Sequence, residues 1–140
     1  MHRQVEQRLI DNEIRYTRGR QAVVESLDAA DGPRSAAELS PDLPSVPLSS
    51  LYRTLAVLEE AGVVVPHLSK KGIARYELAE WLAGHHHHLV CVECGRVEDV
   101  DVPDQYEAQV HELVGAISSQ ASFVATNHAL EIEGRCERCL

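Results

Sequence analysis

The chain of 140 residues has few aromatic side chains, with 4 Tyr, 1 Trp and 1 Phe, so any core must be largely aliphatic. It has no run of about 18 apolar residues, which argues against a membrane span. Its first residues lead into no apolar segment typical of a secretory signal peptide. Cysteine is also scarce, and all 4 cysteines fall into two pairs. These absences favour a cytoplasmic protein of one domain or two small domains, with reduced cysteines.

Basic residues are outnumbered by acidic ones, 13 to 22, and most of the excess lies in the second half of the chain. Residues 1–80 contain 10 Lys/Arg and 12 Asp/Glu, whereas residues 81–140 contain 3 and 10. An acidic chain is in general a poor candidate for binding nucleic acid, because phosphate contacts require cations. The charge pattern therefore leaves DNA binding open only for the first half, and bound divalent cations would partly neutralise the second.

Both cysteine pairs have the spacing Cys-x-x-Cys, at Cys91/Cys94 and at Cys136/Cys139. Two intervening residues allow both thiolates of a pair to bind one metal, and four thiolates fill a closed tetrahedral zinc site. We therefore predict a structural Zn²⁺ that is held by all four cysteines and has no open position for a substrate. Disulfides or a redox motif are the alternatives.

Four consecutive histidines, residues 85–88, precede the first cysteine pair. Alternate residues of an extended strand face opposite sides, so His85 and His87 would serve one metal site and His86 and His88 another. Further ligands must come from elsewhere, and the candidates are His67, Glu77, Asp99, Glu107, His111 and His128. Mixed His and carboxylate ligands suit zinc, and also iron, manganese or nickel. A solvated polar strand that binds metal only adventitiously is the alternative.

The first half has the pattern of three helices followed by a β-hairpin. We expect helices over residues 18–27, 36–39 and 48–60. Thr17 and Ser35 can cap the first two, and Gly62 stands where a C-terminal cap of the third belongs. The buried stripe of the third helix would consist of Leu51, Leu55 and Leu58. Strands over 63–65 and 73–78, joined by a turn at 70–72, would complete a winged helix-turn-helix.

The second half predicts an α/β arrangement with an antiparallel sheet, so the fold class of the whole chain is α+β. Strand patterns occur over residues 89–91, 96–102, 123–126 and 129–133. Residues 105–118 have the period of a helix. The residues of this helix expected to face inward are Val110, Leu113, Val114 and Ile117.

Several short motifs occur together in a specific order. They are residues 17–20, 35–39, 50–55, 58–62 and 75–78, the histidine run with its cysteine pair, and His128 ahead of the second pair. In this order and spacing the chain resembles the ferric uptake regulator (Fur) family of bacterial metal-sensing repressors. The resemblance extends from about Tyr16 to Leu140.

The resemblance implies a homodimer that reads pseudo-palindromic operator DNA. It implies a winged-helix DNA-binding domain (residues 1–80), a hinge (81–84) and a metal-binding dimerisation domain (85–140). Serine, tyrosine and arginine on the third helix would meet the DNA, with other basic residues binding phosphate. The implied DNA contacts are Arg20, Ser49, Ser50, Tyr52, Arg53, Lys70 and Lys71; for the two lysines a solvated turn is the alternative.

The resemblance also implies two regulatory metal sites. The ligands implied for the dimerisation-domain site are His85, His87, Glu107 and His128. The segment between Glu107 and His128 is a few residues longer than the family pattern, which leaves Asp104 and His111 as substitutes for Glu107. The ligands implied for the hinge sensor site are Glu77, His86, His88 and Asp99, and we add His67 as a hypothesis.

These features predict a metal-dependent repressor of metal-homeostasis genes with Zn²⁺ as co-repressor. Zinc is favoured over Fe²⁺ or Mn²⁺ because Pro33-Arg34 stand where iron- and peroxide-sensing members often have a histidine. The cysteine of many zinc-sensing members, near Glu77, is also absent. An iron-, manganese- or peroxide-responsive regulator of the same family is the first alternative. A zinc hydrolase or a metal-storage protein would be of another class, but the chain lacks a His-Glu-x-x-His motif, a nucleophile elbow and a phosphate loop, so we expect no enzyme.

Overall fold

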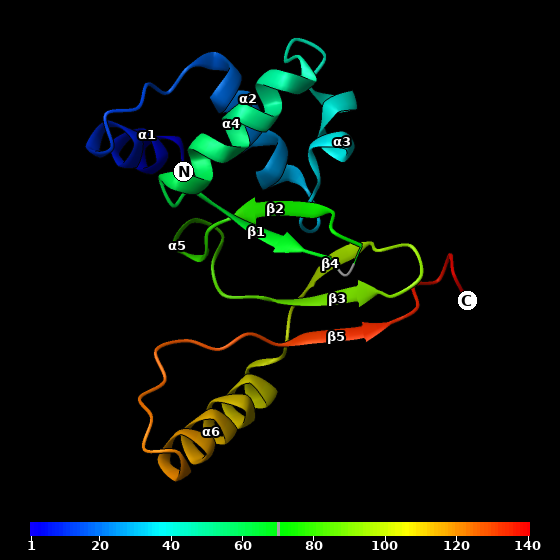
Figure 1. The fold of residues 1–140 in the computed structure, drawn as a ribbon. Coiled ribbons are helices and arrows are strands. Elements are labelled where there is room, and N and C mark those ends of the chain that lie inside the picture. Colours follow the sequence, from blue (N-terminus) through cyan, green and yellow to red (C-terminus); the bar gives the residue numbers. More distant parts are fainter. Residues whose placement is uncertain (70) are drawn as a thin grey trace. The chain divides into compact units, whose positions relative to one another are not determined.

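The computed structural model describes residues 1–69 and 71–140 and divides the chain into two units, residues 1–85 and 86–140. The elements of the first unit are α1 (His2–Asp11), α2 (Arg18–Ala29), α3 (Ala36–Leu39), the 3₁₀ helix η1 (Ser40–Asp42), α4 (Leu48–Glu60), β1 (Val64–Leu68), β2 (Ala74–Leu78) and α5 (Glu80–Ala83) (Figure 1). Those of the second are β3 (His87–Cys91), β4 (Val97–Val100), α6 (Asp104–Gln120) and β5 (Glu131–Gly134). Among the described residues, no helix is both long and apolar enough to cross a membrane.

The caps predicted for α2, α3 and α4 are present. The Thr17 hydroxyl accepts a hydrogen bond from the Arg20 amide at 3.3 Å. Ser35 and Glu38 form a reciprocal capping box at the start of α3. Gly62 has φ +71°, its amide donates to the Glu59 carbonyl, and the following amide reaches back to Leu58. This left-handed glycine ends α4 as a Schellman motif and turns the chain into β1.

The core of the first unit is aliphatic. The predicted stripe on α4, Leu51, Leu55 and Leu58, is fully buried against α2 and its neighbours. Burying one leucine side chain contributes roughly 1.5–3 kcal/mol. Helix α1 was not predicted, yet its Val5 and Leu9 are fully buried in the same core.

A hydrogen bond holds the short helix α5 to the end of α4. The indole N–H of Trp81 donates to the Gly62 carbonyl at 2.8 Å, and the Arg8 guanidinium lies 4.3 Å from the Trp81 ring centroid. Three parts of the first unit therefore meet at the only tryptophan of the chain: α1, the end of α4 and the segment that leads to the histidine run.

Strands β1 and β2 form an antiparallel hairpin with Val65 opposite Glu77 and His67 opposite Arg75. The strand predicted over 63–65 begins one residue later and continues to Leu68. The Arg34 and Tyr76 backbones exchange hydrogen bonds of 2.9 and 2.8 Å, which attaches the hairpin to the helices. The order α2, α3, α4 and hairpin is the order predicted for a winged helix-turn-helix.

The sheet of the second unit has the strand order β4-β3-β5. β3 and β4 are antiparallel as predicted, whereas β5 runs parallel to β3, with Cys91 opposite Gly134. The α+β class is confirmed, and the sheet is mixed. The strand predicted over residues 123–126 is wrong. This segment pairs with no described strand, and its Phe123 and Val124 are 67% and 85% exposed.

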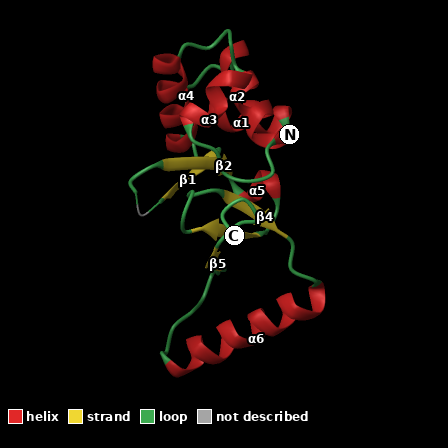
Figure 2. Cartoon of the chain, turned by 90° about the vertical axis from the view of Figure 1, so that its right-hand side faces the viewer, coloured by secondary structure: helices red, strands yellow, loops and turns green. Residues whose placement is uncertain are grey.

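Helix α6 is present, but its apolar residues do not face inward as predicted. None of its described residues is buried, and Leu113 and Ile117 are 59% and 57% exposed. Figure 2 shows α6 joined to the sheet of its own unit by two extended segments, with its length clear of the strands. An apolar stripe on a helix indicates that the stripe must be covered, but it does not indicate by what. The prediction failed because the second unit by itself does not cover this stripe.

Candidate metal centres and DNA-binding surface

The parallel pairing of β3 and β5 brings the two cysteine pairs together. Cys91 ends β3, and the second pair follows the end of β5. The four Sγ atoms lie within 4.8 Å of one another, and those of Cys94 and Cys136 are 3.8 Å apart. A tetrahedral zinc with Zn–S bonds of about 2.3 Å requires sulfur atoms about 3.8 Å apart. The donor set and spacing therefore fit a closed zinc site.

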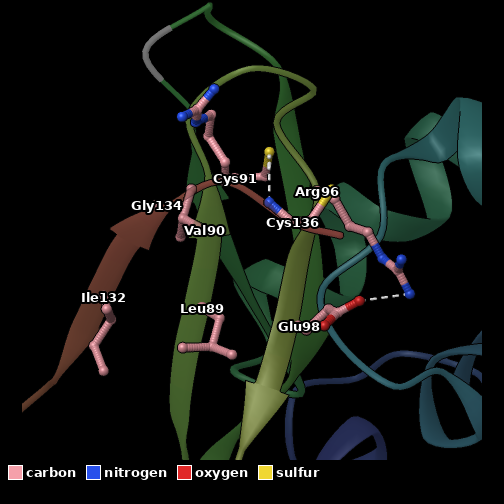
Figure 3. Close-up of a pocket in the computed structure, with 9 residues that line it drawn as sticks. Leu89, Val90, Cys91, Arg96, Glu98, Ile132, Gly134 and Cys136 are labelled. Carbon is pink, nitrogen blue, oxygen red and sulfur yellow. Dashed lines mark hydrogen bonds and ion pairs between the residues drawn. The ribbon is translucent and has the colours of Figure 1, made fainter. Parts of the chain in front are cut away.

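The surroundings of Cys91 favour the thiolate that a metal requires. The Cys136 amide donates to Cys91 Sγ at 3.4 Å, the contact drawn as a dashed line in Figure 3. Hydrogen bonds from the backbone of Cys94 and then Cys136 lower the pKa of Cys91 to about 6. The side-chain contact with Cys136, followed by burial, raises the pKa of Cys139 to about 12. All four cysteines are free thiols in the structure.

A cavity of about 140 Å³ lies beside this cysteine cluster, on the three-stranded sheet. Leu89 and Ile132 line it from β3 and β5, and an ion pair between Arg96 and Glu98 lies at its edge (Figure 3). Its lining is mainly apolar and includes none of the histidines. Of the candidate metal ligands, this cavity therefore touches only the cysteines Cys91 and Cys136 and not the histidine clusters.

A second cluster joins β3, α6 and the segment before β5. Glu107, in the first turn of α6, places Oε2 2.8 Å from His87 Nε2 and Oε1 2.8 Å from His128 Nε2. His87 is only 2% exposed, and the Leu130 amide donates to its Nδ1 at 3.3 Å. One carboxylate thus lies between two imidazoles in a mostly buried setting. Imidazole with carboxylate is a donor set that suits a divalent transition metal.

The structure also places the other residues considered for this cluster. Glu107, and not Asp104, lies between the two imidazoles. His111 contacts His128 through its ring, with centroids 5.0 Å apart. His85 ends the first unit, where its Nδ1 lies 2.7 Å from Glu80 Oε1.

The residues expected at the sensor site form two groups, one in each unit. In the second unit, Asp99 Oδ1 lies 3.5 Å from Nε2 of both His86 and His88, whose ring centroids are 4.9 Å apart. In the first unit, His67 Nε2 lies 2.6 Å from Glu77 Oε1 across the hairpin. Each group therefore combines imidazole with carboxylate.

Most residues expected to contact DNA lie on the surface of the first unit. On α4, Tyr52 is 54% exposed, Ser49 and Arg53 are exposed and Ser50 is half-buried. The Arg20 guanidinium donates to the Arg15 carbonyl beside the start of α2. Lys71 is exposed, and Lys70 lies outside the described residues.

Comparison with known proteins identifies the family. Residues 11–133 match the model of the ferric uptake regulator family. The chain belongs to the ferric uptake regulator family. A ferric uptake regulation protein of Legionella pneumophila is 39% identical over 94 residues, which cover 67% of this chain and 64% of that protein, just under two thirds of its length. The peroxide-responsive repressor PerR of Staphylococcus saprophyticus is 29% identical over 135 residues, covering 94% of this chain and 86% of the relative.

The fold agrees with that of solved Fur proteins. The ferric uptake regulator of Vibrio cholerae superposes with a TM-score of 0.71 at 30% identity, and the match covers 94% of this chain and 98% of the other. Family members are transcription regulators, so this Fur-family chain is a regulator and not an enzyme. The zinc hydrolase alternative is thereby removed.

One contact of the His87 cluster had no signal in the sequence. The Leu130 amide that bonds to His87 is a backbone group, so no residue type or spacing indicates it.

Proposed function

We propose that this chain is a metal-dependent, DNA-binding transcriptional repressor of metal-homeostasis genes, with Zn²⁺ as its co-repressor. The observation that supports it best is the Glu107 carboxylate, which has one oxygen 2.8 Å from His87 and the other 2.8 Å from His128. A buried arrangement of two imidazoles and a carboxylate has a clear use in a Fur-family regulator, because it can bind the signal metal. A cytoplasmic location, with access to DNA, goes with this role.

The proposed metals occupy three sites. A structural zinc is held by Cys91, Cys94, Cys136 and Cys139. The dimerisation-domain site takes His85, His87, Glu107 and His128. The hinge sensor site takes His67, Glu77, His86, His88 and Asp99.

The sensor site would regulate DNA binding by taking ligands from both sides of the hinge. Residues 1–80 would bind DNA, residues 81–84 would act as the hinge, and residues 85–140 would dimerise. A metal held by ligands of both domains favours one relative orientation of them. In a homodimer, that orientation would place the two α4 helices in major grooves about 34 Å apart on a pseudo-palindromic operator. The metal then acts only through its higher affinity for the DNA-competent arrangement.

Zinc is proposed for two reasons: the kind of ligands present, and the absence of a histidine that iron-sensing members often have. The proposed regulatory sites are rich in imidazole, which suits zinc better than manganese. Arg34 stands near the position where iron-sensing members often have a histidine, and it forms an ion pair with Asp31. An arginine cannot bind a metal cation there, since the guanidinium stays protonated. An iron-, manganese- or peroxide-responsive regulator of the same family remains the competing proposal, and a ferric uptake regulation protein and a peroxide-responsive repressor are among the relatives that match this chain.

The test combines metal analysis with DNA binding by the untagged full chain. Binding sites are first selected from random duplex DNA with zinc present, and affinity is then measured by fluorescence anisotropy during Zn²⁺, Fe²⁺ and Mn²⁺ titrations. We expect about one retained zinc per chain and affinity that rises with added zinc. Binding that only iron or manganese switches would reject zinc as co-repressor. Binding that ignores every metal would reject metal-dependent repression itself.

Two variants on one helix show whether the His87 cluster is responsible. Glu107→Ala removes the bridging carboxylate and should abolish the zinc dependence of DNA binding. Glu112→Ala is the matched control, because this exposed carboxylate lies about 140° further around α6. Equal zinc responses of the two variants would exclude the cluster as a regulatory site.

A further inference from the structure

We propose that His111 is a metal ligand at the His87–Glu107–His128 cluster and favours zinc over manganese there. The inference depends on the metal site of the proposed function and adds a donor to it. The second unit would then supply four donors, His87, Glu107, His111 and His128, in addition to the His85 of the proposed function.

The position of His111 on α6 allows this role. His111 follows Glu107 by four residues, so the two side chains lie on the same helix face about one turn apart. Glu107 is held between His87 and His128. The helix that brings the carboxylate to these imidazoles therefore brings a third imidazole with it.

The distances between the rings agree with a shared metal. Two imidazoles on one tetrahedral zinc, with Zn–N bonds of about 2.0 Å, have ring centroids roughly 5 Å apart. The His111 and His128 centroids are 5.0 Å apart, at an interplanar angle of 83°. The His87 and His128 centroids are 5.4 Å apart. His128 thus has a neighbouring imidazole on either side at the separation that ligation requires.

Among the described residues, the His111 side chain is held by its ring contact with His128 and by no polar partner. It is exposed, and within the described parts of the chain it takes part in no hydrogen bond or ion pair. An exposed imidazole without a polar partner can turn a ring nitrogen toward a metal at little energetic cost.

The donors from the second unit would then be three nitrogens and one oxygen. Imidazole suits zinc, copper, iron and nickel, whereas manganese prefers carboxylate, carbonyl and water oxygens. Replacing one imidazole by a carboxylate should therefore shift the preference of this site from zinc toward manganese. His111 is the position to change, because it is not part of the folded core.

The experiment uses the full chain with zinc kept in the cysteine site and follows Co²⁺ binding by its visible absorption. Every protein carries His88→Ala, which removes a donor of the other histidine cluster. Relative to that parent, His111→Ala should bind Co²⁺ about tenfold more weakly or worse and show a changed visible spectrum of the bound cobalt. Glu112→Ala, the matched control on α6, should match the parent. His111→Glu should lower the Zn²⁺-to-Mn²⁺ affinity ratio in competition titrations.

The outcomes separate His111 from His85 and from the regulatory function. Unchanged Co²⁺ affinity and spectrum in His111→Ala overturn the proposal, as does a loss seen only in His85→Ala. Losses in both variants support ligation by His111. Thermal unfolding of each protein without added cobalt checks that the fold is intact. The cobalt assay contains no DNA. Its result for His111 would therefore hold even if the chain proved not to repress transcription.

Discussion

The amide N–H of Leu130 donates a hydrogen bond to Nδ1 of His87, at 3.3 Å. Because this bond uses the lone pair of Nδ1, the ring proton of a neutral His87 lies on Nε2, which faces Glu107 at 2.8 Å. If His87 held a metal through Nε2, the proton on that nitrogen would move to Nδ1. The Leu130 N–H would then face the N–H at Nδ1, and two donors cannot form a hydrogen bond. Metal binding at Nε2 and the hydrogen bond from Leu130 therefore exclude each other.

Zinc binding should therefore expose the Leu130 amide. Leu130 immediately precedes β5, and its carbonyl accepts a hydrogen bond from the His88 amide at 3.2 Å. In ¹⁵N-leucine-labelled protein with the cysteine site already filled, added zinc should shift the Leu130 amide resonance and speed its hydrogen exchange. The Leu55 amide, in the core of the first unit, is the internal reference. A Leu130 resonance unchanged at saturating zinc would mean that the metal does not bind His87 Nε2.

The ion pair between Glu38 and Arg75 should make stability depend on pH. Burial alone would raise the pKa of Glu38, but hydrogen bonds from the Ser35 amide and hydroxyl, and then the Arg75 charge, lower it below 4.5. A lowered carboxyl pKa stabilises the fold above its unfolded value, and this contribution is lost as pH falls through the folded value. The Glu38 side chain is 39% exposed, so solvent screening keeps the effect to about 0.5–1 kcal/mol.

Urea unfolding of Glu38→Gln and the parent at several pH values tests this. The difference in unfolding free energy should be constant above about pH 5 and shrink as the solution is acidified below 4.5. Glu60→Gln, an exposed change at the end of α4, should show no such trend. A difference for Glu38→Gln that persists in acid would show that its cost is unrelated to ionisation.

The helices of the first unit were predictable because their signals are local. A cap at Thr17 or Ser35 acts on amides within three residues, and the Leu51–Leu58 stripe repeats within one helix. Helix α1 was missed because just two of its residues, Val5 and Leu9, are buried in the described structure, and its N-cap residue makes no side-chain hydrogen bond there. Two buried side chains among ten are too weak a pattern to mark a helix without the core they join.

The second unit was less predictable because its order depends on distant pairing. The parallel register of β3 with β5 joins residues more than 40 positions apart, and no turn residue specifies it. The cysteine cluster was nevertheless foreseeable, since Cys-x-x-Cys spacing implies a shared metal whatever the strand direction. The contact of Glu107 with His87 and His128 was expected only from family resemblance, and because the segment between Glu107 and His128 is longer than the family pattern, Asp104 and His111 stayed open.

Arg53 should contribute strongly to operator binding. It is exposed on α4 beside Tyr52, while Leu51 and Leu55 hold the opposite face in the core. Losing an arginine contact to a base edge costs about 1–3 kcal/mol, so Arg53→Ala should weaken zinc-dependent operator binding roughly 5- to 150-fold. Fluorescence anisotropy measures the change, and Arg3→Ala, exposed on α1, is the control. Equal affinity of the two variants would remove Arg53 from the recognition surface.

The exposed stripe on α6 should be the surface that a second copy of the chain covers. Leu113 and Ile117 are four residues apart on one helix face and are 59% and 57% exposed, a cost that dimerisation would recover. Ile117→Glu would bury a charge in that interface, so sedimentation equilibrium should show a shift from dimer to monomer. Ile10→Glu introduces the same charge at an equally exposed position on α1, 58% exposed, and should leave the dimer intact. Since an operator with two half-sites is bound by both protomers together, Ile117→Glu should also lose operator affinity with its zinc sites still filled. A variant that remains dimeric would place the interface elsewhere and leave the exposure of α6 without a structural reason.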